Sequence, residues 1–298
     1  MACPIPLRII NPKYKKIASD NKEPVENYDQ RNDYYIDVPC GVCYNCRKSY
    51  KSMWRIRLSH EWHYLPKSAK TNCFFVTLTF RDEYLPSGSN VRHVKSNTAR
   101  LVRLFLERVR KKYKVSVRHW FVSEYGGKTS RLHLHGILFN PPFKEYELSL
   151  LWRYGFTDSK LLTPKRISYV TTYINKLMDS LIEDPAKRQF VLCSPGLGKA
   201  YATDKVTRAT AHVNGAPSPF GYHGASPFAL PRYYRKYIFD DDEREDMTQA
   251  YFMHYSDDVI PPPPYYIGTT RFDDYSLYVE ACKSLKHRYN QIYGKSCK

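Results

Sequence analysis

The sequence predicts an α+β fold in which a central antiparallel sheet is flanked by helices. Three observations support this prediction. Residues 72–80, NCFFVTLTF, are dense in β-branched and aromatic side chains, which is typical of a buried strand. Residues 97–113 repeat apolar side chains at helical spacing. Residues 115–139 contain two strand-like runs joined by a turn with two glycines, and such a hairpin is antiparallel.

The chain before the first strand has two parts. Residues 1–38 are polar and rich in Pro, Asn and Asp, with no clear period, which predicts an irregular arm. A cluster of cysteines follows, and a basic helix begins near Arg47.

Three closely spaced cysteines, Cys40, Cys43 and Cys46, have the spacing of a zinc knuckle. We therefore expect a structural zinc site, and the alternative is three reduced, partly buried thiols. The sequence leaves three candidates for the fourth ligand, which are Cys3, His60 and His63.

The helix of residues 97–113 has an apolar stripe and a basic face. The stripe consists of Leu101, Leu104, Phe105 and Val109. The basic side chains are candidates for contacts with a DNA backbone, although a charged helix face is usually only solvated. They are Arg100, Arg103, Arg108, Arg110, Lys111 and Lys112.

The rest of the chain predicts a short helix ending near Trp152, a longer helix at residues 165–182, and weak patterning beyond residue 185. A closing helix is expected near residues 273–293. The chain thus divides into an arm with the cysteine cluster, a central domain and an irregular C-terminal extension. These are residues 1–47, 48–185 and 186–298.

The charge balance indicates a polyanionic partner. The chain has 47 Lys and Arg against 29 Asp and Glu, a net charge of +18, and basic surface of this kind neutralises phosphates. Its 27 tyrosines suit stacking on unpaired bases, although tyrosine also fills cores. No apolar run has the length of a signal peptide or membrane span, so we expect reduced thiols in a cytosol and no membrane partner.

Two histidines on one strand predict a metal site. In RLHLHGILF, His133 and His135 point to the face opposite the leucines, because strand side chains alternate. If the turn pairs Glu124 with Arg131, the Glu124 carboxylate shares that face, although a one-residue slip would reverse it. Two imidazoles and a carboxylate suit a divalent ion with open positions. The alternative is an exposed strand with chance histidines.

The helix at residues 165–182 carries a second pattern. Its apolar stripe consists of Val170, Ile174, Leu177 and Leu181, and a row of Tyr169, Tyr173 and Lys176 repeats that spacing one residue earlier. A tyrosine can attack a phosphodiester and hold it as a covalent ester, and a lysine can steady the charge. The alternative is that the tyrosines only pack.

Taken in order, NCFFVTLTF, RLHLHGILF and YVTTYINK resemble the three motifs of HUH endonucleases, the rolling-circle replication initiators and relaxases. The pattern Y-x-x-x-Y-x-x-K, together with CGVCYNCR, SEYGGKTSRLHLHG and LPRYYRKY, is most similar to the replication initiators of microviruses of the gokushovirus type. The resemblance runs from about Cys3 to Tyr237.

This resemblance implies a nicking domain at residues 48–185 and an HUH-like palm. His133 and His135 would hold Mg²⁺ or Mn²⁺, and Glu124 would be the third ligand. The rivals for that third position are Asp82 and Glu83.

The resemblance also implies a reaction and partners. Tyr169 and Tyr173 would be the nucleophiles, assisted by Lys176. One tyrosine would nick single-stranded DNA at a replication origin, keep the 5′ phosphate and leave a 3′ hydroxyl for a host polymerase. The second would cut after one round, when the circle is resealed. No nucleotide cofactor would be needed. A host helicase and the cytoplasm of a bacterial host are implied in the same way.

Two functions of other classes remain open. A non-catalytic single-stranded nucleic-acid-binding protein would account for the charge and the tyrosines. A metal-dependent nuclease that uses water would account for the histidines. Only the tyrosine mechanism forms a covalent protein–DNA adduct.

Overall fold

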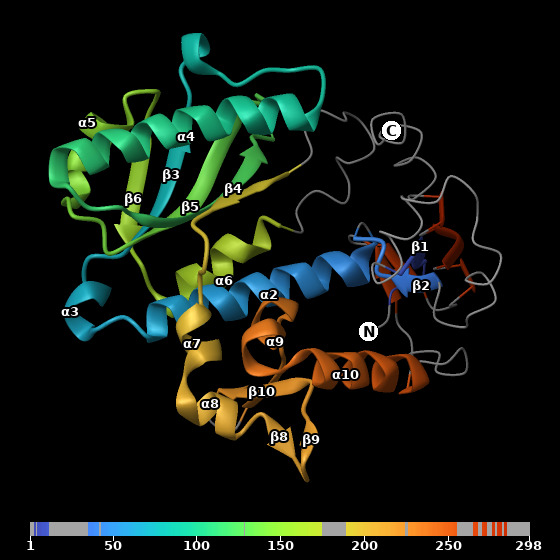
Figure 1. Ribbon diagram of the computed structural model, residues 1–298. Coiled ribbons are helices and arrows are strands. Elements are labelled where there is room, and N and C mark those ends of the chain that lie inside the picture. Colours follow the sequence, from blue (N-terminus) through green and yellow to red (C-terminus); the bar gives the residue numbers. More distant parts are fainter. Residues whose placement is uncertain are drawn as a thin grey trace, which may run out of the picture. The chain divides into compact units, whose positions relative to one another are not determined.

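The protein is described from a computed structural model (Figure 1). Its chain forms two compact units, residues 1–49 with 260–298, and residues 50–259, and each is described by itself. The predicted domain boundaries stay predictions. The described residues are 3, 5–11, 35–41, 43–127, 129–174, 189–223, 226–254, 265–267, 270–272, 276–277, 279–281 and 283–284.

Within the second unit, a five-stranded antiparallel sheet has the order β6-β3-β5-β4-β7, which confirms the α+β prediction. The sequence did not predict the two outer strands, because they are short and β6 is largely exposed and polar. The strands are β3 (Phe74–Thr79), β4 (Arg118–Tyr125), β5 (Leu132–Phe139), β6 (Thr157–Leu161) and β7 (Val191–Cys193).

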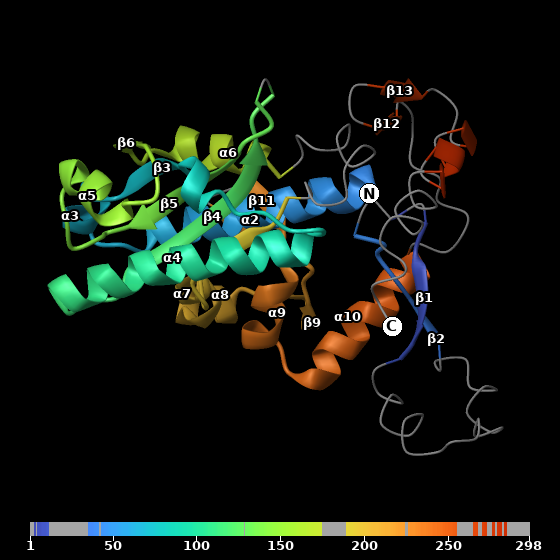
Figure 2. The same ribbon diagram turned by 90° about the horizontal axis from the view of Figure 1, so that it is seen from above.

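One face of the sheet packs against α4 (Val91–Tyr113) and α5 (Leu148–Trp152) (Figure 2). Helix α4 begins six residues before the predicted start, because the Asn90 side chain accepts hydrogen bonds from two backbone amides of its first turn. The short turns η2 (Asp82–Tyr84) and η3 (Glu145–Glu147) precede these helices. The predicted core leucines are buried here, and they are Leu132, Leu134 and Leu138.

The other face packs against the later turns of α2 (Tyr44–His63) and against α6 (Pro164–Thr172). Helix α3 (Lys67–Lys70) is a short turn before β3. The Thr163 hydroxyl accepts a hydrogen bond from the Arg166 amide and so starts α6. Residues 175–188, the predicted continuation of this helix, lie outside the described residues.

The described part of the extension that was predicted to be irregular contains regular elements. Their aromatic side chains pack around Tyr234, but the elements are too short to show a clear period. The helices are α7 (Lys199–Thr203), α8 (Lys205–Ala209), α9 (Arg232–Ile238) and α10 (Asp241–His254), and the hairpins are β8 (His212–Val213) with β9 (Ala216–Pro217) and β10 (Phe220–His223) with β11 (Ser226–Ala229).

The first unit contains two small antiparallel pairs. The arm that was predicted to be irregular includes β1 (Leu7–Ile10) paired with β2 (Tyr35–Val38), and β12 (Tyr265–Ile267) pairs with β13 (Thr270–Phe272). Only fragments of the predicted closing helix are described. In the described part of the chain, no helix combines the length and the apolarity needed to span a membrane.

Candidate active site

Glu124 lies near the end of β4, and both histidines lie on the neighbouring strand β5. Glu124 is directly opposite His133, and Val122 is opposite His135. The prediction placed Arg131 opposite Glu124, so it was wrong by two residues. Because side chains alternate with a period of two, this shift keeps the carboxylate on the same face as the imidazoles.

The three side chains converge on one point. The Nε2 atoms of His133 and His135 lie 3.1 Å and 2.7 Å from Oε2 of Glu124. The three ligand atoms lie within 4.8 Å of one another, which is the arrangement of a metal-binding triad. All three side chains are mostly buried.

Neighbouring groups orient both imidazoles. Nδ1 of His133 lies 3.2 Å from the Arg131 carbonyl oxygen, and a carbonyl can only accept, so Nδ1 carries the proton and Nε2 keeps its lone pair. Nδ1 of His135 hydrogen-bonds the Thr77 hydroxyl at 3.1 Å. Sequence reasoning missed Thr77, although its strand places every second side chain on the histidine face.

The rival carboxylates are elsewhere. Asp82 and Glu83 lie on η2 with strongly exposed side chains, and each pairs with an arginine. Asp82 pairs with Arg131, the residue that precedes the histidine strand. Among the described residues, Glu124 is the carboxylate that joins the two histidines.

The two tyrosines lie beside this triad. The ring of Tyr173 stacks on His135, with centroids 4.0 Å apart and planes at 10°. Tyr173 is 4% exposed, whereas Tyr169 is 52% exposed. The Tyr173 hydroxyl donates a hydrogen bond to the Tyr169 hydroxyl oxygen at 2.7 Å. Lys176 lies outside the described residues.

The environment of Tyr173 keeps its hydroxyl protonated. Burial is the largest cause that raises its pKa, and the hydrogen bond to Tyr169 and the nearby Glu124 carboxylate raise it further. Tyr173 is therefore a hydrogen-bond donor, and the accessible phenolic oxygen belongs to Tyr169.

Not all basic residues of α4 are available to DNA. Arg108 donates to the Tyr154 hydroxyl at 2.9 Å, and Lys112 pairs with Glu147 at 2.8 Å. The other four are exposed, but their helix covers the sheet face opposite the triad. Their contact with DNA stays a prediction, and they are Arg100, Arg103, Arg110 and Lys111.

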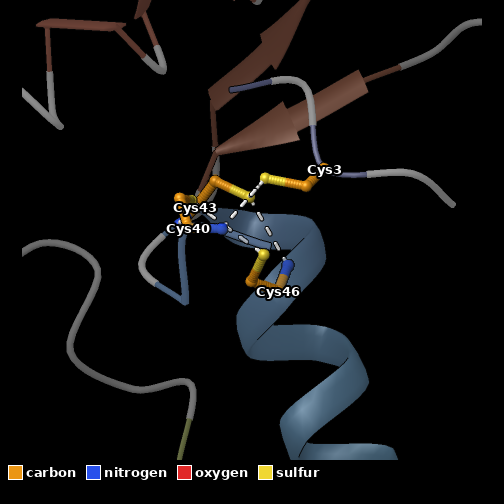
Figure 3. A group of neighbouring side chains, drawn as sticks. All are labelled: Cys3, Cys40, Cys43 and Cys46. Atoms are coloured by element: carbon orange, nitrogen blue, oxygen red, sulfur yellow. Dashed lines mark hydrogen bonds between the residues drawn. The ribbon is translucent and has the colours of Figure 1, made fainter. Parts of the chain in front are cut away.

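In the first unit, the cysteine cluster includes Cys3 as its fourth thiol (Figure 3). The Sγ atoms of Cys3 and Cys43 are 3.8 Å apart, and those of Cys40 and Cys46 are 4.0 Å apart. The alternative ligand His60 instead hydrogen-bonds the Tyr234 hydroxyl at 3.0 Å.

Residues 73–178 match a family model of viral replication-associated proteins, the ORF2 family. The chain is 25% identical over 281 residues to the replication-associated protein ORF2 of Spiroplasma virus 4, with 84% of this chain and 83% of that protein covered. It is 23% identical to the replication-associated protein ORF4 of Chlamydia phage 1, with 51% of this chain and 41% of that protein covered.

The resemblance to microvirus replication initiators is confirmed. The segment that matches the family model contains β3, the Glu124–His133–His135 triad and both tyrosines. No solved structure matches the chain.

Proposed function

We propose that this protein initiates rolling-circle DNA replication by metal-dependent, site-specific nicking and joining of single-stranded DNA through a covalent 5′-phosphotyrosine. The observation that carries the proposal is the stacking of Tyr173 on the histidine of a Glu–His–His triad, with the accessible Tyr169 hydroxyl beside it. The similarity to phage replication-associated proteins supports the role in replication.

The donor set of the triad fits a divalent ion. It offers two imidazole nitrogens and one carboxylate oxygen, and the Arg131 carbonyl fixes the His133 tautomer with a lone pair on Nε2. When bound, Mg²⁺ or Mn²⁺ would polarise the scissile phosphodiester.

The two tyrosines divide the work. The accessible Tyr169 hydroxyl acts first, because the Tyr173 hydroxyl donates to its oxygen and so stabilises the phenolate that forms. As the bond from this oxygen to phosphorus forms, the tyrosine releases its proton and the phosphorus–O3′ bond breaks. The departing oxygen takes up a proton and becomes the 3′ hydroxyl. Tyr173 makes the second cut, and Lys176 steadies the charge.

The proposal includes the partners implied by the resemblance. These are single-stranded DNA at a replication origin, and a helicase and a polymerase of a bacterial host, in whose cytoplasm the protein would act. The exposed basic residues of α4 would hold DNA away from the nicking site.

The cysteine cluster is part of the proposal as a structural zinc site. A tetrahedral Zn²⁺ with Zn–S bonds of about 2.3 Å separates its sulfurs by about 3.8 Å, close to the observed 3.8 Å and 4.0 Å. Three backbone amides also point to these sulfurs at 3.4–3.5 Å, as expected where thiolates are held.

The test is a denaturing gel of the protein with labelled single-stranded DNA from its own genome, with Mg²⁺ or Mn²⁺. We expect a slow-migrating covalent band that requires the metal and disappears in the Tyr169→Phe/Tyr173→Phe double variant. If every genome fragment binds without forming a band, the protein is a non-catalytic single-strand binder. Cleaved DNA without a band would indicate the water-dependent nuclease.

A further inference from the structure

A cleft in the second unit lies between α2, α9 and the loop that joins β7 to α7. Its volume is about 570 Å³, in the range of small-molecule and nucleotide sites. We call it the α2–α9 cleft. The residues that define it are Trp54, Arg57, Lys199, Tyr233, Lys236 and Tyr237.

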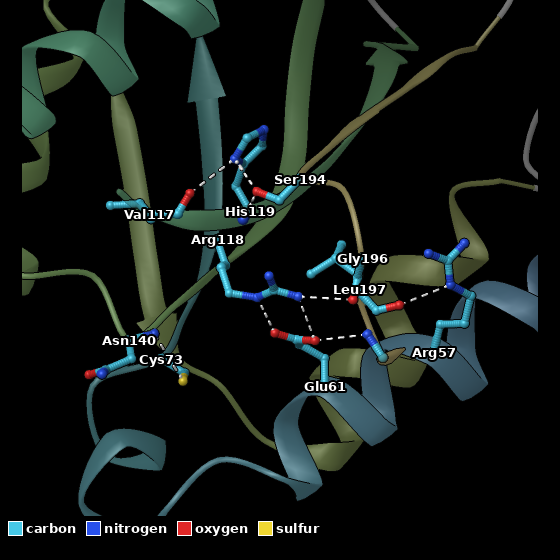
Figure 4. Close-up of polar contacts among 11 residues, drawn as sticks. Arg57, Glu61, Cys73, Val117, Arg118, His119, Asn140, Ser194, Gly196 and Leu197 are labelled. Atoms are coloured by element: carbon cyan, nitrogen blue, oxygen red, sulfur yellow. Dashed lines mark hydrogen bonds and ion pairs between the residues drawn. The ribbon is translucent and has the colours of Figure 1, made fainter. Parts of the chain in front are cut away.

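Arg57 is a buried cation at this cleft. It is 8% exposed, and its guanidinium lies between two rings, 4.4 Å from the Trp54 centroid and 3.9 Å from that of Tyr233. Its Nε donates to the Leu197 carbonyl at 3.1 Å (Figure 4). Among the described residues, no carboxylate lies within ion-pair distance of Arg57.

The nearest acidic residue on the same helix is already occupied. The carboxylate of Glu61 pairs with Arg118 and accepts the Gly198 amide at 2.8 Å (Figure 4). Burying a charge without a counter-ion is costly. The Arg57 guanidinium therefore favours an anion from outside the chain.

The other charged residues of the α2–α9 cleft are also cations. Lys199 and Lys236 each place their ammonium 4.8 Å from the ring centroid of Tyr237. The described lining includes no acidic residue. Cations interleaved with aromatic rings suit a polymer that alternates phosphates with flat bases.

The cleft lies beside the strand that carries Glu124. Cys193, at its edge, pairs with Trp120 on β4, and Trp54 contacts the same residue, with ring centroids 5.7 Å apart. Trp120 and Glu124 are four residues apart and point to the same face, a separation of about 13 Å along the strand. An unpaired strand can thus reach from the triad into the cleft.

We propose that the α2–α9 cleft binds unpaired DNA next to the nicking site, with phosphates on Arg57, Lys199 and Lys236 and a base against Tyr237. The inference rests on the proposed function for the choice of DNA as the polymer. Its test is therefore a binding measurement in which no nicking can occur.

The test uses full-length protein with Tyr169→Phe and Tyr173→Phe, in EDTA, titrated into dye-labelled oligothymidylate while anisotropy is followed. Adding Lys199→Ala and Lys236→Ala should weaken binding roughly 10-fold and reduce the salt slope by about 1.4, since each single-strand phosphate contact contributes about 0.7. The matched control removes two exposed lysines elsewhere, Lys67→Ala with Lys205→Ala. Equal losses in both variants would overturn the inference.

A second pair of variants tests the base contact. Tyr237→Phe keeps the aromatic face and should bind like the parent, whereas Tyr237→Leu should bind roughly 10-fold more weakly. Duplex DNA should not distinguish the two, because paired bases cannot lie against the ring. A loss of the same size with duplex would overturn the assignment to unpaired DNA.

The proposed function and the cleft can fail separately. If the unmodified protein forms no covalent adduct, the anisotropy measurements still decide the cleft. If the adduct forms on oligonucleotides while the lysine and tyrosine variants bind like their controls, the cleft assignment falls and the nicking function stands.

Discussion

At the scale of single residues, the proposed site depends on which ring nitrogen each histidine presents. The Arg131 carbonyl settles this for His133, and the Thr77 hydroxyl holds His135 from its other side. A side chain that never touches the metal can therefore control affinity for it.

Replacing Thr77 tests this control. Thr77→Val should lower the affinity for Mn²⁺ about 10-fold, because the His135 ring loses its orienting hydrogen bond. Isothermal titration of Mn²⁺ measures the effect. Thr203→Val, which removes an exposed hydroxyl on α7, should leave the affinity unchanged. Equal affinities in the two variants would show that Thr77 has no such role.

The tyrosines give a second prediction. Tyr169→Phe should reduce the first covalent adduct at least 100-fold, while Tyr173→Phe should keep it within about 10-fold, because Tyr173 contributes a hydrogen bond and not the attacking oxygen. Gel quantification of the adduct after one turnover measures both. The opposite order would assign the first cut to Tyr173.

Sequence patterns predicted much of this site. Strand alternation placed both histidines and Glu124 on one face, and the helix pattern placed the two tyrosines together. The patterns could not show that Tyr173 is buried against His135 and Tyr169 is exposed, because that difference depends on how α6 docks on the sheet. The role of Thr77 depends in the same way on the pairing of β3 with β5.

At the scale of elements, the hairpin of β4 and β5 needs a glycine between its second histidine and the core. A Cβ added at Gly136 would lie 2.4 Å from the Trp120 carbonyl oxygen and 2.2 Å from the Phe121 ring. Neither atom can move away cheaply, since one is backbone and the other is fully buried.

Gly136→Ala should therefore destabilise the protein by about 1–3 kcal/mol, as overpacking does. Urea unfolding followed by tryptophan fluorescence measures the change. Gly127→Ala is the matched control, because nothing lies within 4 Å of its added Cβ. It should change the free energy of unfolding by no more than about 0.5 kcal/mol. Similar values for the two variants would contradict the packing argument.

The elements that the sequence missed share a physical cause. Strand β6 is an exposed edge with few apolar side chains, and β7 spans three residues, so neither shows alternation. The first turns of α4 are polar, and their signal is the Asn90 cap.

At the scale of the whole molecule, the second unit has a pH-sensitive core. Tyr234 is fully buried, and burial raises its pKa above the usual value of 10.0. The folded protein keeps this proton above about pH 10, whereas the unfolded chain loses it, so the free energy of unfolding should fall as pH rises. Urea unfolding at pH 9 and 11 should show a smaller drop in Tyr234→Phe. An equal drop would exclude this residue as a cause.

The zinc proposal concerns the first unit. The protein purified without chelator should contain one zinc per chain, and Cys43→Ser should lose it, because three thiolates remain. Elemental analysis measures both. Cys193→Ser, a change outside the cluster, should keep the zinc. Zinc retained in Cys43→Ser would show that this thiol is not a ligand.

The compactness of the triad along the chain has a consequence for folding. Its three ligands lie within twelve residues on one hairpin, so their contact order is low and the loop that closes them is short. The tyrosines arrive from a helix that starts 29 residues after His135. During synthesis the hairpin emerges first. The ligand set should therefore assemble before either nucleophile is docked against it.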